Sequence, residues 1–173
     1  MMERARTMRS DTPVVQIERF SKPRESEVWS LISQVWAEFD IHDDPSRERD
    51  LGDPIHAYQG NVSGFWLATS NNRVIGTACL KDLGDGLIAL KRFYVLKAFR
   101  GTAIGTAQRL LDHLVEHARR SGANAICLGT IEVTVAAQRF YEKNGFRSVP
   151  RSELPTDRFA AEIDTLFYRL SLV

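Results

Sequence analysis

A glycine-containing corner is the first segment whose residue types suit ligand chemistry, and it reads Arg-Gly-Thr-Ala-Ile-Gly-Thr from position 100 to 106. It joins a predicted strand to a predicted helix, so several main-chain N–H groups and the positive end of the helix dipole meet there. Gly101 and Gly105 leave room for a close approach. Thr102 and Thr106 add hydroxyl donors, and Arg100 adds positive charge. The corner therefore predicts a phosphate site.

The same corner has a second interpretation, a strand-to-helix turn that binds nothing. The three spaced glycines of the dinucleotide fingerprint are absent from it, and so is the lysine of the P-loop. Taken alone, the corner leaves both interpretations open.

The elements that must position the corner follow from hydrophobic periodicity. Alternation predicts a strand over 14–20, and Pro23 opens a helix that carries its apolar residues on one face. Three β-branched and aromatic runs, separated by the turns Asn-Asn and Leu-Gly-Asp-Gly, predict an antiparallel meander. The further predictions are a helix over 105–121 ended by Gly122, a strand over 125–129, a helix over 134–144 closed by Gly145, and a last strand over 163–172.

The order of these elements predicts one α+β domain. It runs strand, helix, a second short helix, three strands, helix, strand, helix, two strands. The strand, helix, strand unit from 87 to 128 requires a right-handed parallel crossover, whereas the meander is antiparallel. We therefore predict a mixed, mostly antiparallel central sheet flanked by helices, with one parallel strand pair. The domain is predicted to span 13–173, after a flexible tail over 1–12.

The composition fits a packed core and argues against several kinds of partner. Of 173 residues, 43% are hydrophobic and 26% charged, and the formal net charge is +1. This charge gives no field that favours nucleic acid or an acidic membrane. The first residues lack the apolar core of a secretion signal, and no run reaches membrane-spanning length, so we predict a cytoplasmic protein. Cys79 and Cys127 lie in apolar runs and are predicted to be free buried thiols.

Two motifs, in matching order and spacing, resemble the GCN5-related N-acetyltransferase (GNAT) superfamily. In that family a strand ending in Val leads into Arg-x-x-Gly-x-Gly/Ala, and here Val95 precedes the corner. The later motif, Ala-x-x-x-Tyr-x-x-x-Gly-Phe, stands as Ala137, Tyr141, Gly145 and Phe146. The resemblance covers about 14–172, with specific motifs only from 89 to 146. It implies a GNAT-like fold in which the parallel strand pair forms an acyl-CoA cleft, and transfer of an acetyl group from acetyl-CoA to an amine.

The resemblance assigns roles to the corner and to the strand before it. The main-chain amides of the corner would hold the pyrophosphate of coenzyme A, and the strand end would pair with the pantetheine arm as an added strand would. Ala103 stands where relatives usually have Gly, which the loop tolerates if φ at 103 is negative. Thr134 stands where many relatives have Asn, which puts that cofactor contact in question. The residues implied in acetyl-CoA binding are Phe93, Tyr94, Val95, Arg100, Gly101, Thr102, Ala103, Ile104, Gly105, Thr106 and Thr134.

Acyl transfer needs a neutral amine, a polarised thioester carbonyl and a proton for the departing thiolate. Tyr141 matches the family's general acid, and the phenol's ordinary pKa of about 10 keeps it protonated at neutral pH. The alternative is that Tyr141 only packs, together with Phe140, on its helix face. A backbone N–H within the strand end would polarise the carbonyl.

The general base is harder to assign. Relatives carry a carboxylate at positions that Ala89 and Gly129 hold in this chain. Glu132, in the turn that follows the strand over 125–129, is the nearest candidate base, although a solvated turn residue is an equally good interpretation. A water chain or an amine that is already partly neutral would also serve.

The acceptor is predicted only as a primary amine of a small molecule or a peptide. The stretch over 38–53 holds seven acidic residues and two arginines, and it predicts a long loop with about one helical turn. Relatives line the acceptor site with this connection, so Asp43, Asp44 and Asp50 would favour a cationic amine unless they form only a hydrated loop. His113 and His117 have metal-like spacing but are predicted to face solvent, and no metal is expected.

A second class of function stays open. A non-catalytic acyl-CoA-binding sensor or partner subunit would also lack the two carboxylates, whereas the presence of Tyr141 favours an enzyme. The chain is expected to be a monomer or a homodimer, with no nucleic-acid or membrane partner.

Overall fold

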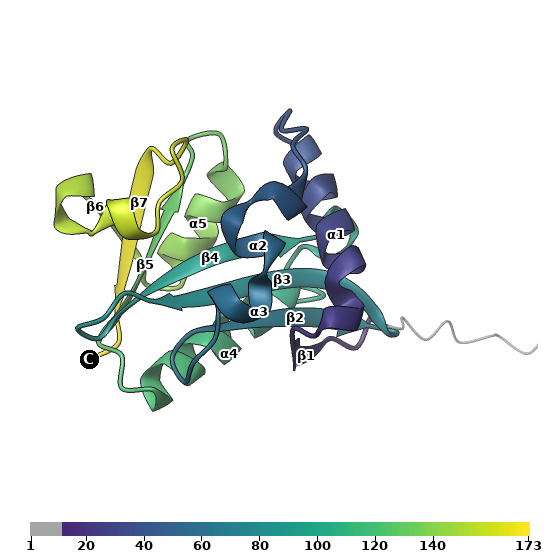
Figure 1. Cartoon of the computed structure of the whole chain (residues 1–173), viewed down its shortest axis with the longest axis horizontal. Coiled ribbons are helices and arrows are strands. Elements are labelled where there is room, and N and C mark those ends of the chain that lie inside the picture. The colour runs from purple at the N-terminus through teal and green to yellow at the C-terminus, as the bar shows by residue number, and fades with distance from the viewer. Residues whose placement is uncertain (1–11) are drawn as a thin grey trace, which may run out of the picture.

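The computed structural model describes residues 12–173, so the predicted tail over 1–12 lies outside the described residues except for its last position. The described chain forms a seven-stranded sheet with helices on both faces (Figure 1). The strands are β1 (Gln16–Arg19), β2 (Gly64–Ser70), β3 (Arg73–Asp82), β4 (Leu87–Val95), β5 (Ala125–Thr130), β6 (Arg147–Val149) and β7 (Leu166–Ser171).

The strand order in the sheet is β1-β2-β3-β4-β5-β7-β6. Every neighbouring pair is antiparallel except β4 and β5, which are parallel. The predicted mixed, mostly antiparallel sheet with one parallel pair is confirmed. Tight turns explain the meander, since Asn71 and Asn72 both have positive φ, as a two-residue hairpin between twisted strands requires.

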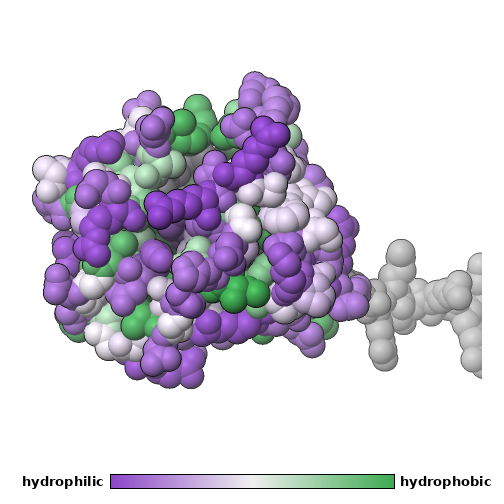
Figure 2. Space-filling model, in the orientation of Figure 1, coloured by the Kyte–Doolittle hydropathy of each residue, from purple (hydrophilic) through white to green (hydrophobic). Residues whose placement is uncertain are grey.

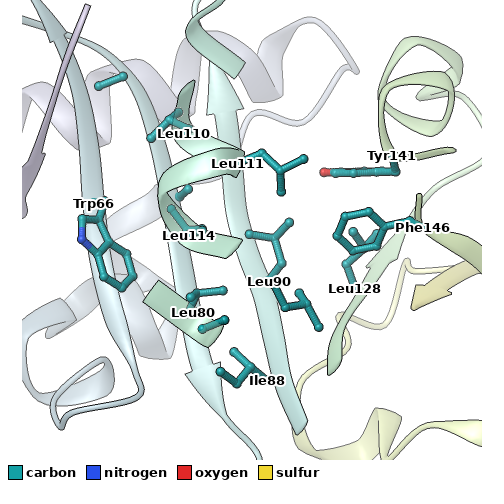
Figure 3. Packing of buried hydrophobic residues seen from close by; sticks show 14 of the residues in the cluster. Trp66, Leu80, Ile88, Leu90, Leu110, Leu111, Leu114, Leu128, Tyr141 and Phe146 are labelled. Atoms are coloured by element: carbon teal, nitrogen blue, oxygen red, sulfur yellow. The ribbon is translucent and has the colours of Figure 1, made fainter. Parts of the chain in front are cut away.

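Alternation along the strands divides the core into two layers. In β2, Trp66 and Ala68 pack on the face covered by α4 (Thr106–Arg120) and α5 (Val135–Lys143), which we call the α4 face. Phe65 and Leu67 point the opposite way and pack with α1 (Glu25–Ala37), on the α1 face. Figure 3 shows the α4-face core, where Leu110, Leu111 and Leu114 of α4 meet the side chains of the sheet.

The helix limits agree closely with the predicted ones. The helix predicted over 105–121 is α4, which begins after Gly105 at φ 73° and is followed by Gly122 at φ 79°. The helix predicted over 134–144 is α5. Because a left-handed φ is strained for most other residues, these glycines set where the helix begins and where the chain leaves it.

The connection over 38–53 is more ordered than predicted. After α1 the chain makes a 3₁₀ turn (Pro45–Arg47) and two one-turn helices, α2 (Arg49–Gly52) and α3 (Pro54–Ala57), which cross in front of the sheet on the α1 face (Figure 1). Pro45, Leu51 and Pro54 are buried there. These apolar residues lie singly among charged ones, so periodicity could not reveal them.

The predicted solvent exposure of His113 and His117 is wrong. Both rings are half-buried and lie edge-on to Trp66 of β2, with ring centroids 5.7 Å and 4.7 Å from the indole. Nε2 of His117 also lies 3.0 Å from the Val62 carbonyl. Burial lowers the pKa of both imidazoles, which therefore act as core-edge packing groups. The prediction for the cysteines is confirmed, because Cys79 and Cys127 are both buried and free.

Candidate functional site

The two parallel strands at the centre of the sheet separate part-way along. Only Leu87 to Ala89 of β4 pair with β5, opposite Ala125 to Cys127. The rest of β4 therefore keeps an unpaired edge on its β5 side within the described residues. In Figure 1 the ribbons of β4 and β5 diverge toward α5, and the space-filling view of the same face is hollowed at that place (Figure 2).

A bulge in β4 sets how the separated strand end is oriented. Arg92 has a left-handed φ of 52°, and the pairing register between β3 and β4 shifts beside it. The hydroxyl of Thr77 donates to the Arg92 carbonyl (2.8 Å) and fixes the bulge. Beyond the bulge, Phe93 stacks on Phe140 of α5. The predicted strand-end residues Phe93, Tyr94 and Val95 thus stand on the unpaired part of β4.

The glycine corner follows directly on this strand end. Within residues 12–173, no acceptor is recorded for the main-chain N–H groups of Gly101 to Ile104 or of Thr106 to Gln108, whereas the Gly105 N–H donates to the Gly101 carbonyl (2.9 Å). Gly101 has φ 99°, and a Cβ added there would meet nothing within 4 Å. Ala103 has no positive φ, so the loop tolerates its methyl group in place of the usual Gly. The corner therefore offers clustered donors with open space before them.

Two side chains of the corner differ in what they do. Thr106 is only 1% exposed, and its Oγ1 is buried without a hydrogen-bond partner among the described residues. Arg100 is already engaged: its guanidinium forms two 2.7 Å hydrogen bonds to Glu38, and its Nε donates to the Val95 carbonyl (2.8 Å). Arg100 therefore ties the corner to the end of α1, and its predicted side-chain contact with phosphate would need this pair to open.

Tyr141 lies in α5 with its ring in the α4-face core and is 6% exposed. In Figure 3 its hydroxyl oxygen points away from α5, toward the side of β4 and Leu111. No hydrogen bond to that oxygen is recorded within residues 12–173. Burial, followed by the nearby Tyr94 and Asp164, raises its pKa, so the phenol stays protonated throughout the neutral range. A protonated, unpartnered phenol suits the predicted role of proton donor.

The predicted acidic residues do not act as one group. Asp50 is mostly buried and accepts from Arg92 Nε (2.9 Å) and Nη2 (2.6 Å), and also from the Tyr58 hydroxyl. Although burial alone would raise the pKa of Asp50, the hydrogen bonds and charge of Arg92 lower it to about 2. Asp44 instead caps the 3₁₀ turn by accepting from the Ser46 N–H (2.9 Å), and Asp43 is exposed. Only Asp50 reaches β4, and Arg92 neutralises it.

The remaining predicted residues lie at the turn after β5. Glu132 is exposed, and within residues 12–173 its carboxylate has no recorded partner. The hydroxyl of Thr134 donates to the Ile131 carbonyl (2.6 Å) and lies 2.8 Å from Thr130 Oγ1, so it is used inside the turn. Ala89 is fully buried. The structure therefore brings the strand end, the corner and Tyr141 together, and leaves Glu132 and Thr134 at the rim.

Two charged residues near the site were missed by the sequence reading. Lys91 of β4 has no ion-pair partner among the described residues, and its charge acts on both Asp50 and Asp164. Asp164 packs against Gly129 at the end of β5. An Asp shortly before a final strand was visible in the sequence, but only the register between β5 and β7 places it there.

Two further features of the described residues concern metals and membranes. In residues 12–173, no cluster of three or more His, Cys, Asp or Glu side chains is arranged to hold a metal ion. None of the helices in this range has the length and hydrophobicity that crossing a bilayer requires.

Comparison with known proteins gives consistent matches. The acetyltransferase (GNAT) family model matches residues 27–146. A crystal structure of a GNAT-family acetyltransferase from Staphylococcus aureus aligns with a TM-score of 0.86 and 30% identity, over 92% of this chain and all of that one. N-acetylglutamate synthase from Neisseria gonorrhoeae, solved with coenzyme A and N-acetyl-glutamate, aligns with a TM-score of 0.72 over 92% of this chain and 35% of that one. Its 16% identity supports the fold alone.

The N-acetylaspartate synthetase of Danio rerio is 33% identical over 135 residues, which are 71% of this chain and 47% of that protein. The frog protein described as probable N-acetyltransferase camello, from Xenopus tropicalis, is 35% identical over 95 residues, covering 53% of this chain and 42% of that protein. The chain thus spans less than half the length of these curated relatives.

Proposed function

The chain belongs to the GNAT family of acetyltransferases, and on this basis we propose that it transfers an acetyl group from acetyl-CoA to a primary amine of a small molecule or peptide. The observation that carries the proposal is the separation of β4 from β5, which leaves a strand edge that leads into a corner of unpartnered N–H groups. An added strand and an anion are the ligands that such an edge and such a corner accept. The pantetheine arm and pyrophosphate of one coenzyme A molecule supply both.

The residues present fit acetyl-CoA. The N–H groups of Gly101 to Ile104 and of Thr106 would hold the pyrophosphate, and the buried Oγ1 of Thr106 has a hydrogen-bonding capacity that nothing else in the described chain uses. The edge of β4 over Phe93 to Val95 would bind the pantetheine arm. Acetyl-CoA supplies the activated acyl group as a thioester. Tyr141 protonates the departing sulfur, and a β4 N–H polarises the carbonyl in a ternary complex.

The acceptor is an amine that also carries a carboxylate, such as an amino acid. Lys91 has no ion-pair partner among the described residues, so its ammonium is available to attract a carboxylate on the acceptor. Asp50 is paired with Arg92, which neutralises its charge, so Asp50 attracts a cationic acceptor only weakly. The likeness to an N-acetylaspartate synthetase supports the same class. A cationic amine drawn by the exposed Asp43 and Asp44 is the competing acceptor class.

We take 13–173 as one catalytic domain, acting in the cytoplasm as a monomer or homodimer. An acyl-CoA-binding sensor or partner subunit on the same fold remains the alternative function, because Ala89 and Gly129 hold the positions where relatives carry carboxylates. Tyr141, unpartnered and protonated, favours the enzyme.

The test is release of free coenzyme A from acetyl-CoA across a panel of amines, with titration calorimetry of acetyl-CoA binding beside it. The panel contains acidic amino acids, neutral amino acids, polyamines and N-terminal peptides. Turnover fastest with carboxylate-bearing amines is expected. Fastest turnover with polyamines would transfer the assignment to the cationic class, and binding without turnover on any amine would favour the sensor.

A further inference from the structure

Asp164 places a carboxylate at the end of β5, a strand that has no acidic side chain of its own. It stands in the turn before β7, and the next residue, Thr165, donates its N–H to the Thr130 carbonyl (2.9 Å). A Cβ added to Gly129 would lie 2.5 Å from Oδ2 of Asp164. The carboxylate therefore occupies the volume that a side chain at position 129 would fill.

The main chain holds this carboxylate in place. The Ala161 N–H donates to Oδ2 (2.8 Å), and the Asp164 N–H donates back to the Ala161 carbonyl (3.1 Å). Within residues 12–173 no ion pair of Asp164 is recorded and no other side chain donates to its carboxylate, although the residue is half-buried. Its second oxygen, Oδ1, has no recorded hydrogen-bond partner among the described residues and keeps its capacity to accept a proton.

The charges that act on Asp164 come from several elements. Burial raises its pKa, while the Ala161 N–H lowers it, as do the charges of Lys91 and Arg92 in β4 and of Arg151 in the 3₁₀ turn Arg151–Glu153. The net direction is upward. Asp164 in turn contributes to the raised pKa of Tyr141, so the carboxylate lies within electrostatic range of the phenol. A carboxyl group with a raised pKa accepts a proton more readily, and a phenol with a raised pKa keeps its own proton at neutral pH.

The other acidic residues around the site are less suited to take a proton. Asp50 and Glu48 both accept hydrogen bonds from Arg92, and this guanidinium holds the pKa of Asp50 well below its usual range. Glu132 is exposed, so nothing orients its carboxylate toward β4. We propose that Asp164 is the general base of the acetyl transfer, deprotonating the acceptor amine, and that it replaces, from the turn before β7, the carboxylate missing from position 129. This role rests on the proposed function.

The acceptor ammonium gives one proton to Asp164, and the freed electron pair of nitrogen forms the C–N bond to the acetyl carbon. The C–S bond breaks with its electrons on sulfur, and Tyr141 protonates that sulfur. The nitrogen then loses a second proton, which returns to the Tyr141 oxygen through water, and Asp164 passes its proton to solvent. One amide, one thiol and one released proton result.

Asp164→Asn tests the role, because the amide retains the oxygen that accepts from Ala161 and removes the base. With the best amine of the wild type, kcat/KM at pH 7 should fall about a hundredfold or more, and the acidic limb of the pH profile should move to higher pH, where it follows the ionisation of the amine itself. Activity should recover at high pH, where the amine is already neutral. Acetyl-CoA affinity should not change. Glu162→Gln, an exposed neighbour in the same turn, is the matched control and should leave the profile intact.

Moving the carboxylate from position 164 to position 129 distinguishes a loss of catalysis from a loss of folding. Asp164→Ala opens the space beside Gly129, whose φ is not in the left-handed region, so Gly129→Glu in that background should restore part of the rate and return the acidic limb toward lower pH. The proposal would be overturned if Asp164→Asn kept the wild-type kcat/KM and the wild-type acidic limb of the pH profile. It would also be overturned if Glu132→Gln, and not Asp164→Asn, lowered the rate and shifted this limb. Failure of the wild type with every amine would overturn the proposed function itself, and this role with it.

Discussion

At the scale of single residues, the site consists of groups that the fold leaves without partners. The hydroxyl of Tyr141 and the Oγ1 of Thr106 have no hydrogen-bond partner among the described residues, and the Lys91 ammonium has no ion-pair partner. Thr106 Oγ1 is fully buried, as is the one other unpartnered buried side-chain atom of the described chain, Ser70 Oγ in β2. Because buried polar groups are normally satisfied within the protein or by water, a ligand at the corner would complete the hydrogen bonding of Thr106. Arg100 and Asp50 show the reverse, because neighbouring charges already engage both side chains.

Tyr141→Phe retains the ring packing and deletes the proton donor. We expect kcat to fall about tenfold to a thousandfold while acetyl-CoA affinity and thermal stability stay constant. Because burial raises the Tyr141 pKa, the wild-type rate should not decline up to pH about 10. Steady-state kinetics from pH 6 to 10 check both statements. A wild-type rate in the variant would leave Tyr141 as a packing residue.

Asp50→Asn should destabilise the fold by about 2 kcal/mol or more, because the largely buried Arg92 guanidinium would keep only the more exposed Glu48 as an ion-pair partner. Urea unfolding measures this change. The exposed Asp43→Asn serves as control and should shift stability by less than about 0.5 kcal/mol.

The same pair predicts a pH dependence of stability. The folded pKa of Asp50 is lowered to about 2 from an ordinary 3.8, so its contribution is fully present above pH about 4 and is lost as the pH falls toward 2. The Asp50→Asn variant should therefore lose less stability than the wild type across this interval. Equal losses would show that the pair contributes nothing.

At the scale of elements, the corner between β4 and α4 concentrates the proposed anion site into a few peptide units. Its glycines are required by backbone conformation, since Gly101 and Gly105 both have positive φ. Neither would bring a Cβ into close contact with the rest of the chain. The space before the amides is thus available to a ligand.

Gly105→Asp places a carboxylate at the N-terminal end of α4, where it can accept from the same amides as a phosphate would. Acetyl-CoA affinity should fall at least about tenfold, which equals about 1.4 kcal/mol. Gly105→Asn is the matched control, with a similar shape and no charge, and it should weaken binding less. Isothermal titration decides between them, and equal affinities for wild type and Gly105→Asp would remove the site from this corner.

Sequence patterns predicted those elements that have strong local signals. The two long helices and the meander follow from apolar periodicity and from positive-φ glycines and asparagines, and the corner and Tyr141 follow from motif spacing. The one-turn helices α2 and α3 are too short to show a period. The Arg92–Asp50 pair joins residues far apart in sequence, and Asp164 meets Gly129 only through strand register. Such long-range contacts have no local pattern to reveal them.

At the scale of the whole molecule, one sheet connects all the packed layers. The α1-face and α4-face clusters draw on opposite sides of the same strands, and a third cluster around Leu154, Phe159 and Phe167 packs on Ala89 and Cys127. Removing either layer of helices would expose a face of the common sheet. This shared sheet supports treating 13–173 as one cooperative unit.

We therefore expect a single thermal unfolding transition, which acetyl-CoA at about 100 times its Kd should raise by about 5 to 10 °C. The ligand stabilises only the folded chain, and in the proposed complex it would also form hydrogen bonds with the β4 edge. Scanning calorimetry with and without acetyl-CoA measures the shift. Gly105→Asp should show a smaller one, and two separate transitions would contradict a single domain.

The unpaired edge of β4 has one more consequence, for handling of the protein. The outer strands of the sheet, β1 and β6, are only four and three residues long, so they offer little to an incoming chain. The longer free edge lies inside the molecule, between β4 and β5. Ligand-free protein should therefore aggregate faster on concentration or storage than protein saturated with coenzyme A, and light scattering of the two samples over time would record the difference.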